Sequence, residues 1–114
     1  MIKIINRTAD IVIADKARIA RSFVSRLLGL MFRSRMEQGE ALVFYHAPSI
    51  HMFFMRFAID VVFLDRSMKV VKVVSRLEPW RMVNCFGSFC TLELQSGAAE
   101  GRVSAGDILE FVPA

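Results

Sequence analysis

Three residues whose side chains can take part in chemistry lie within the strongly apolar segment Ser49 to Asp65. They are His51, Arg56 and Asp60. An imidazole titrates near neutrality and a carboxylate can orient it, so His51 and Asp60 are the candidates for a catalytic acid/base pair. An arginine can bind an anionic substrate. A polar group among apolar neighbours also needs a partner, since burying it without one costs about 1–3 kcal/mol.

Each of these residues also has a purely structural interpretation. His51 can be a hydrogen-bonded, partly buried histidine, and Asp60 can pair with Arg56 or accept backbone hydrogen bonds at a kink between strands. No serine or cysteine lies in a recognisable nucleophile motif, and the sequence has neither a phosphate-binding loop nor a dinucleotide-binding fingerprint. A hydrolase- or isomerase-like enzyme is therefore the alternative to a binding domain.

Sulfur and imidazole groups around the same segment would suit a soft metal such as Cu(I). The candidate ligands are His46, His51, Met52, Met55, Cys85 and Cys90. In a strand His51 and Met52 point to opposite faces, and the spacing of Cys85 and Cys90 is not a standard zinc pattern. We therefore predict no metal and no cofactor, and we interpret the two cysteines as reduced, inert thiols.

The composition is that of a small, apolar, basic domain spanning residues 1–114. Hydrophobic residues make up 54% of the chain, above the usual ~45–50%. Some of this apolar surface can line a pocket or a contact between two copies, so a structural homodimer subunit is a third alternative. The formal net charge is +4, and no acidic residue lies between Lys16 and Met36. This basic stretch could meet an acidic partner, but no nucleic-acid motif accompanies it, so we do not expect nucleic acid.

The sequence also bears on location. No apolar run approaches the ~18–20 residues that a membrane-spanning helix needs. The segment from Met1 to Arg7 lacks the continuous apolar stretch and the cleavage site of an export signal. We therefore expect a cytoplasmic protein without a membrane partner.

Two periodicities together indicate an α+β domain that is mainly β. Apolar residues recur at intervals of three and four from about Arg18 to Gly29, which predicts one main amphipathic helix. Short apolar or alternating runs predict strands at Met1 to Asn6, Ile11 to Ala14, Ala41 to Tyr45, Ile50 to Met55, Ile59 to Leu64, Lys69 to Ser75, Cys90 to Gln95 and Asp107 to Val112. We expect a strongly bent antiparallel sheet or partial β-barrel with the helix packed against it.

Trp80 is the only tryptophan and lies between Pro79 and Arg81 in an expected loop. A tryptophan beside an arginine in a loop can line a pocket or a contact surface, or it can cover the open end of a sheet. With the residues of the apolar segment it completes the predicted ligand pocket, which consists of His51, Met55, Arg56, Asp60 and Trp80. The expected partner is an unknown small ligand or protein.

An ordered series of motifs resembles a known family. The series comprises Gly29 to Arg33, Gly39 to Phe44, Ile50 to Asp65, Leu77 to Arg81, Leu92 to Gly97 and Gly106-Asp107. It resembles the domain-of-unknown-function 192 (DUF192) family, uncharacterised proteins of bacteria and archaea. The resemblance implies a compact β-rich domain with one main helix and brings no established activity.

The same resemblance ranks the candidate positions. It implies that Met55, Arg56, Asp60 and Pro79-Trp80 are the leading site residues. The chain departs from the family pattern at two positions, with Ala58 where proline is frequent and Met68 at a turn position where glycine is usual. Those departures imply a looser bend at the first position and a strained turn at the second.

Overall fold

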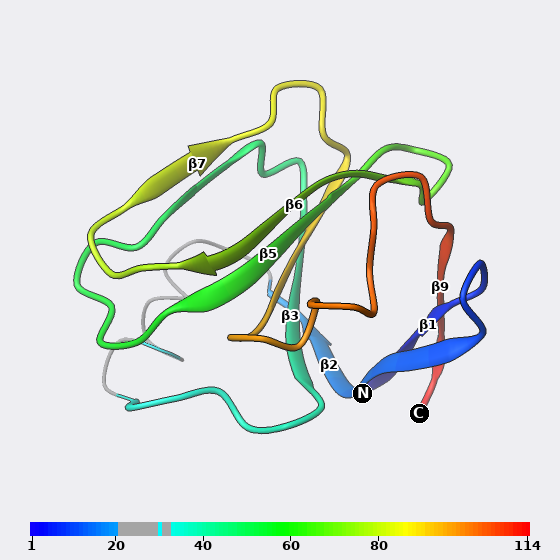
Figure 1. The fold of residues 1–114 in the computed structure, drawn as a ribbon, viewed down its shortest axis with the longest axis horizontal. Helices are drawn as coiled ribbons and strands as arrows, with labels where there is room; N and C mark the ends of the chain where they lie inside the picture. The colour runs from blue at the N-terminus through cyan, green and yellow to red at the C-terminus, as the bar shows by residue number, and fades with distance from the viewer. Residues whose placement is uncertain (21–29, 31–32) are drawn as a thin grey trace.

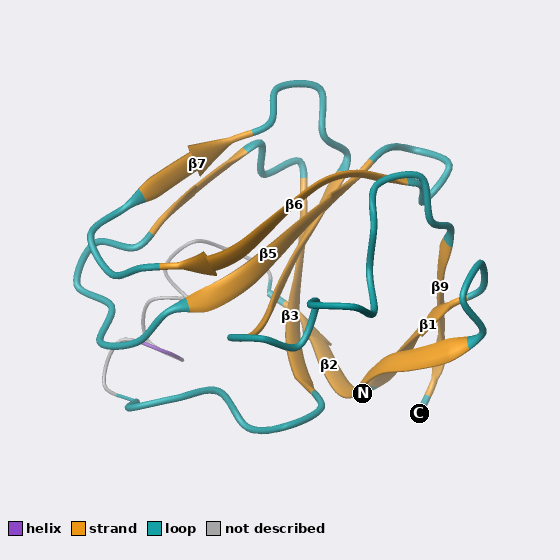
Figure 2. Cartoon of the chain, viewed as in Figure 1, coloured by secondary structure: helices purple, strands orange, loops and turns teal. Residues whose placement is uncertain are grey.

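The computed structural model describes residues 1–20, 30 and 33–114 of the chain. Its named elements there are all β-strands: β1 (Ile2–Asn6), β2 (Ile11–Ile19), β3 (Glu40–Tyr45), β4 (Ser49–His51), β5 (Ile59–Leu64), β6 (Val70–Leu77), β7 (Met82–Asn84), β8 (Cys90–Gln95) and β9 (Leu109–Pro113). Seven of them form one sheet in the order β6-β5-β8-β3-β2-β1-β9, while β4 and β7 form a separate pair. The predicted mainly β architecture is confirmed (Figures 1 and 2).

The large sheet curls until its two ends meet. The loop between β5 and β6 reaches the start of β9, where Lys69 and Ile108 form an antiparallel bridge (Figure 1). Val70 donates its N–H to the carbonyl oxygen of Asp107 at 2.8 Å, and Gly106 donates to that of Val70 at 2.7 Å. These contacts produce the half-barrel form that the many short strands predict.

One pair of strands departs from the expected antiparallel sheet or partial β-barrel. β2 and β3 run parallel, in a register from Lys16–Glu40 to Ile19–Val43. Parallel neighbours need a long crossover connection, because the chain must return to the same end of the sheet before the second strand begins. β2 ends at Ile19 and β3 begins at Glu40, which leaves enough sequence between them for such a connection.

The expected main helix, from about Arg18 to Gly29, is not borne out. Arg18 and Ile19 belong to β2, where they pair with Leu42 and Val43. Cross-strand pairing therefore overrides the helical period at the start of the predicted segment. The rest of that segment, residues 21–29, lies outside the described residues.

Apolar side chains fill both faces of the central strands. In β5, Val62 and Leu64 belong to a first core and Val61 and Phe63 to a second. The first core also includes Ile4, Ala17, Val43, Leu92, Ala99 and Leu109, and the second includes Leu30, Met36, Phe44, Ile50, Met52 and Met55. A strand that is buried on both faces reads as a continuous apolar run, which explains the prediction of β5 with its observed bounds.

The strand expected from Ile50 to Met55 is much shorter than predicted. β4 ends at His51, and β4 pairs with β7. The chain then turns around the carbonyl oxygen of Met52, which accepts hydrogen bonds from Trp80 N–H at 2.7 Å and from Met55 N–H at 3.2 Å. These bonds bring the loop after β4 and the loop before β7 together.

The departure from the family pattern at Met68 lies in a turn with left-handed backbone. Met68 has a φ of +64°, and its N–H donates to the carbonyl oxygen of Asp65 at 3.0 Å. The Asp65 carboxylate supports the turn by accepting from Ser67 N–H, Ser67 Oγ and Lys69 N–H. A non-glycine residue at positive φ is strained, as the resemblance implied.

Candidate functional site

Asp60 is fully buried, and its carboxylate accepts hydrogen bonds from backbone N–H groups rather than from an imidazole. Its Oδ1 accepts from Arg76 N–H at 2.8 Å, and its Oδ2 accepts from Ala99 N–H at 2.9 Å. Arg76 has a φ of +54°, so the acceptor fixes an irregular point in β6. Asp60 thus fastens β6 and the segment after β8 to β5, which agrees with its structural interpretation.

His51 and Asp60 lie on different sides of β5. Alternation along the strand places Asp60 with Val62, on the face that contributes to the first core. The β4–β7 pair packs on the other side, because Ile50 belongs to the second core. The geometry therefore gives no support to an acid/base pair between His51 and Asp60.

Two further predicted residues differ sharply in exposure. Met55 is buried in the second core and can serve a ligand only indirectly, whereas Arg56 is exposed in the loop after β4. His51 is half-buried and Trp80 is exposed. Of the five predicted site residues, His51, Arg56 and Trp80 are therefore the ones a partner could reach.

Four rings form a contiguous aromatic surface on the two loops that Met52 joins. His51 stacks on Phe53 with ring centroids 4.8 Å apart, Phe53 lies 6.0 Å from Trp80, and Phe54 meets Trp80 edge-on at 4.9 Å. Phe54 is 62% exposed and Trp80 58% exposed. We call His51, Phe53, Phe54 and Trp80 the aromatic surface.

The backbone beneath the aromatic surface is strained at two positions. Phe54 has a φ of +66° and Trp80 a φ of +68°. Left-handed conformations of this kind are costly for aromatic residues and tend to occur where function requires them. Phe53 and Phe54 fall within the strand expected from Ile50 to Met55. Two adjacent aromatic residues would point to opposite faces of such a strand, and this is the signal that could have marked them as exposed.

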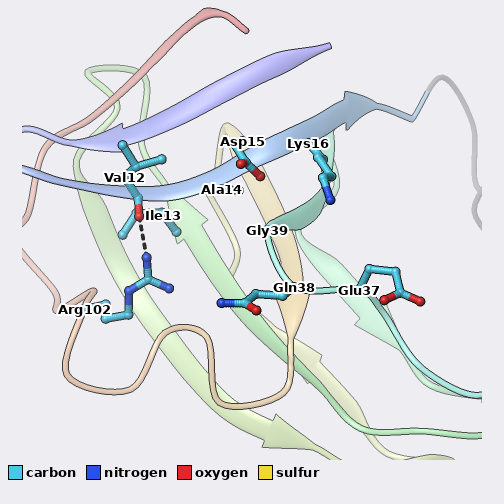
Figure 3. A pocket seen from close by; sticks show the side chains of 9 residues that line it. All are labelled: Val12, Ile13, Ala14, Asp15, Lys16, Glu37, Gln38, Gly39 and Arg102. Carbon is cyan, nitrogen blue, oxygen red and sulfur yellow. Dashed lines mark hydrogen bonds between the residues drawn. The ribbon is translucent and has the colours of Figure 1, made fainter.

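A hollow that the sequence did not predict lies beside β2. It has a volume of about 700 Å³ and is lined by Val12, Ile13, Ala14, Asp15, Lys16, Glu37, Gln38, Gly39 and Arg102 (Figure 3). The Arg102 guanidinium donates to the carbonyl oxygens of Val12 and Ala98. Three separate stretches of chain thus supply its wall.

Gly39 takes a left-handed backbone conformation where this hollow meets β2. Its φ is +80°, and a Cβ at this position would lie 2.3 Å from Asp15 Oδ1. Its carbonyl oxygen accepts from Asp15 N–H at 3.1 Å and from Lys16 N–H at 2.9 Å. The turn before β3 is therefore clamped against β2.

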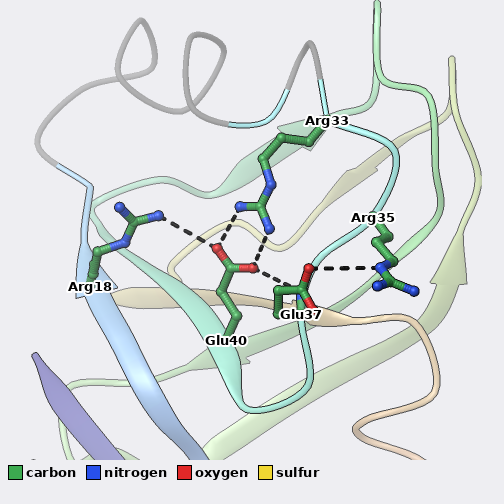
Figure 4. A network of polar contacts seen from close by, with 5 residues as sticks. All are labelled: Arg18, Arg33, Arg35, Glu37 and Glu40. Carbon is green, nitrogen blue, oxygen red and sulfur yellow. Dashed lines mark hydrogen bonds and ion pairs between the residues drawn. The ribbon is translucent and has the colours of Figure 1, made fainter.

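A network of arginines surrounds Glu40 on the other side of this turn (Figure 4). Arg33 binds the Glu40 carboxylate with both terminal nitrogens, at 2.6 and 2.7 Å, and Arg18 Nη2 lies 3.5 Å from Glu40 Oε2. The hydrogen bond from Arg33 is the main cause that lowers the pKa of Glu40, and the same bond raises the pKa of Arg33. A second hollow, of about 300 Å³, is lined by Met1, Lys16, Arg18, Arg33, Glu37 and Glu40.

Cys90 fits the interpretation of an inert thiol, because burial raises its pKa to about 12 and so disfavours the reactive thiolate form. Cys85 is also free but only half-buried. In the part of the chain that the structure describes, we find no helix with the length and apolarity to cross a membrane.

Comparisons with known proteins place the chain in a family. The model of the DUF192 family, described as "Uncharacterized ACR", matches residues 4–111. The UPF0127 protein of Pyrococcus horikoshii is 42% identical over 85 residues, which cover 69% of this chain and 70% of that protein. The UPF0127 protein of Pyrococcus abyssi is 41% identical over 85 residues, covering 69% of each.

A solved structure shows the same fold. A protein of unknown function from Novosphingobium aromaticivorans superposes with a TM-score of 0.77 at 20% identity, covering 96% of this chain and 82% of that one. The two curated relatives are archaeal, and this fold neighbour is bacterial. The family resemblance indicated by the motif series is therefore confirmed: the chain belongs to the uncharacterised DUF192 family.

Proposed function

We propose that this domain binds a segment of a partner protein through its aromatic surface. The observation that carries the proposal is the set of contacting, solvent-accessible rings of His51, Phe53, Phe54 and Trp80. Tryptophan and other aromatics are enriched at the energetic centres of protein interfaces, because they bury much apolar area at little entropic cost. The four rings are accessible to water, so burying them against a partner would gain the free energy of removing their apolar area from water.

The burial of Met55 and Asp60 favours a surface over a deep pocket. Both belong to the packed interior, so they support the loops rather than contact a ligand. Met52 holds the loops in place through its two hydrogen bonds, and its side chain is also buried. The rings are thus presented by a fixed backbone, which lowers the entropic cost of binding.

Charge defines the expected partner further. Arg56 and Arg81 are exposed in the same two loops, against the single exposed acid Glu78. The whole chain carries a formal net charge of +4. The segment that fits is one with large apolar side chains next to carboxylates, since an arginine binds carboxylates with two parallel hydrogen bonds.

The compartment in which this interaction takes place is part of the same proposal. The free thiols of Cys85 and Cys90 suit a reducing compartment, and we propose that the domain binds its partner in the cytoplasm.

Selection from a peptide library tests the proposal. The wild-type domain is used to select binders from random displayed peptides, and a Phe54→Ser/Trp80→Ser variant is used to remove peptides that bind elsewhere. We expect enriched peptides to combine apolar residues with Asp or Glu and to bind the double variant at least about tenfold more weakly. Trp80, the only tryptophan, reports binding directly through its fluorescence.

The matched control is Phe86→Ser. Phe86 is 83% exposed and is not one of the contacting rings, so its replacement removes a comparable apolar surface elsewhere. Peptides that bind the double variant as tightly as the wild type would contradict the proposal. A wild-type dimer that the double variant converts to monomer would instead identify the aromatic surface as a contact between copies of this chain.

A further inference from the structure

The arginine network beside the second hollow is built around a carboxylate that is already fully engaged. Glu40 Oε1 accepts from Arg33 Nη2 at 2.7 Å and from Glu37 N–H at 2.8 Å. Its Oε2 accepts from Arg33 Nη1 at 2.6 Å and lies 3.5 Å from Arg18 Nη2. Glu40 therefore fixes two guanidinium groups and has little capacity left for a cation from solution.

Arg18 contributes charge that Glu40 does not use up. Its side chain is 55% exposed, and its ion pair with Glu40, the longest contact in the network around that carboxylate, engages only Nη2. A guanidinium has five N–H donors, and within the part of the chain that the structure describes no acceptor pairs with the other donors of Arg18, so they can serve an acceptor in the hollow. Lys16 lines the same hollow from β2, two residues before Arg18.

The balance of charge around the second hollow favours an anion. Of the described residues that line it, Lys16, Arg18 and Arg33 carry cationic side chains, and Glu37 and Glu40 carry carboxylates. Glu37 is itself paired with Arg35 at 3.7 Å, outside the hollow's lining (Figure 4). A positive surplus within a concave site concentrates the field and attracts anionic ligands.

The two hollows are neighbours, because Lys16 and Glu37 line both of them. Their volumes, about 700 and 300 Å³, fall in the ~300–1,000 Å³ range of small-molecule sites. The larger one offers polar side chains suited to hydroxyl or amino groups, namely Asp15, Gln38 and Arg102 (Figure 3).

We propose that these adjoining hollows form a binding site for a small phosphorylated molecule. The phosphate lies in the second hollow against Lys16, Arg18 and the outer edge of Arg33, and the polar body of the molecule extends into the larger hollow. A tetrahedral phosphate can meet cations from several directions at once, whereas a planar carboxylate is matched best by one guanidinium fork. Glu40 acts as a positioning residue that holds the arginines.

A small molecule fits this lining better than a nucleic acid strand does. Among the described residues that line the two hollows none is aromatic, so these residues offer no ring on which bases could stack. The site is also separate from the aromatic surface, because its lining shares no residue with it. The two proposals therefore stand or fall independently.

Titrations followed by NMR of the backbone amides test the site at constant ionic strength. The probes are inorganic phosphate, glycerol 3-phosphate and acetate. We expect saturable shifts at Lys16, Arg18 and Gly39 with both phosphate compounds. Glycerol 3-phosphate binds more tightly than phosphate because its hydroxyl groups reach Asp15 and Gln38, and acetate binds more weakly than either.

Two variants of the network and one matched variant complete the test. Arg18→Gln and Lys16→Gln should each weaken phosphate binding by about tenfold, with the folded spectrum retained because both side chains are exposed. Arg7→Gln is the matched control, since Arg7 is also an exposed arginine paired with a glutamate, Glu110 of β9, but lies just after β1 and lines neither hollow. It should leave binding unchanged.

Specific results would overturn the assignment. Equal phosphate affinity of wild type and Arg18→Gln would remove the second hollow as the anion site. Acetate binding as tightly as phosphate would overturn the choice of a phosphate group. Equal affinity for phosphate and glycerol 3-phosphate would show that the larger hollow takes no part.

Discussion

Asp60 and Ala99 are joined by a buried hydrogen bond of 2.9 Å, from the N–H of Ala99 to Oδ2 of Asp60. The bond ties the middle strand β5 to the segment that follows β8, while Oδ1 of the same carboxylate holds Arg76 in β6. One side chain thus organises three parts of the half-barrel that are far apart in the sequence.

Asp60→Ala should destabilise the domain more than His51→Ala does. The first change removes the acceptor of the Arg76 and Ala99 N–H groups, and the buried N–H of Ala99, left unpaired, costs about 1–3 kcal/mol. The second removes a half-buried ring from a surface stack. Urea unfolding of both variants measures the difference. Equal losses, or a larger loss for His51→Ala, would contradict the structural role of Asp60.

Gly39→Ala should be more destabilising than Gly87→Ala. Both glycines have positive φ, at +80° and +85°, so both variants incur the left-handed penalty of about 1–2 kcal/mol. Only at Gly39 does the new Cβ meet another atom, Asp15 Oδ1, whereas nothing lies within 4 Å at Gly87. Adding Asp15→Ala to Gly39→Ala should recover the excess loss in a double-mutant cycle. A cycle without coupling would show that the clash is relieved in another way.

Stability should fall in acid, with a contribution from Glu40. The pKa of Glu40 is lowered in the folded protein, chiefly by the hydrogen bond from Arg33. The unfolded chain therefore binds the proton more readily, and the stabilisation is complete above the ordinary glutamate pKa of 4.5 and is lost as the pH falls through the folded value.

Glu40→Gln isolates that contribution. Asp65 and Glu110 also have lowered pKa values, so the wild type alone would report a sum. Chemical unfolding at a series of acidic pH values should show a flatter pH dependence for Glu40→Gln than for the wild type. Parallel curves for the two proteins would rule out Glu40 as a source of the acid sensitivity.

The two cysteines should differ in reactivity toward a thiol reagent at mildly alkaline pH. Cys90 is buried and its pKa is raised to about 12, so it should react only when the protein unfolds. Cys85 is half-buried and should react in the folded state. The number of thiols that react in the wild type and in Cys85→Ser shows which cysteine is labelled in the folded protein. Rapid labelling of folded Cys85→Ser would contradict the prediction that Cys90 is unreactive.

The strands that sequence reasoning predicted with their observed bounds are β5 and β8. β5 is buried on both faces and leaves a continuous apolar signal. β8 alternates apolar and polar residues, which located the strand, although its polar residues Thr91 and Glu93 are buried as well. β7 was missed because it has three residues, two of them exposed. At Arg18, pairing with Leu42 in β3 contradicted a local helical period, and such pairing between distant segments has no signature in a short window.

The candidate site shows the same limit. Burial of Asp60 among apolar residues could be predicted from composition, but its partners come from positions 76 and 99 and no local pattern points to them. The hollows depend on the parallel crossover, which brings Gly39 against Asp15 and sets Glu40 among its arginines. The stacking of His51 on Phe53 could have been predicted from the sequence, because the two residues are only two positions apart.

The pairing of β1 with β9 has a consequence during synthesis. Residues Ile2–Asn6 lie between β2 and Leu109–Pro113, so one edge of the first strand stays open until the last strand has been made. The bridge from Lys69 to Ile108 depends on the same late segment. A chain emerging from the ribosome can therefore form the β1–β2 hairpin early. The contacts of β9 that complete the half-barrel form only after residue 113 has left the exit tunnel. Contacts between such distant residues also make refolding slow, on the ms–s scale of non-local β topologies.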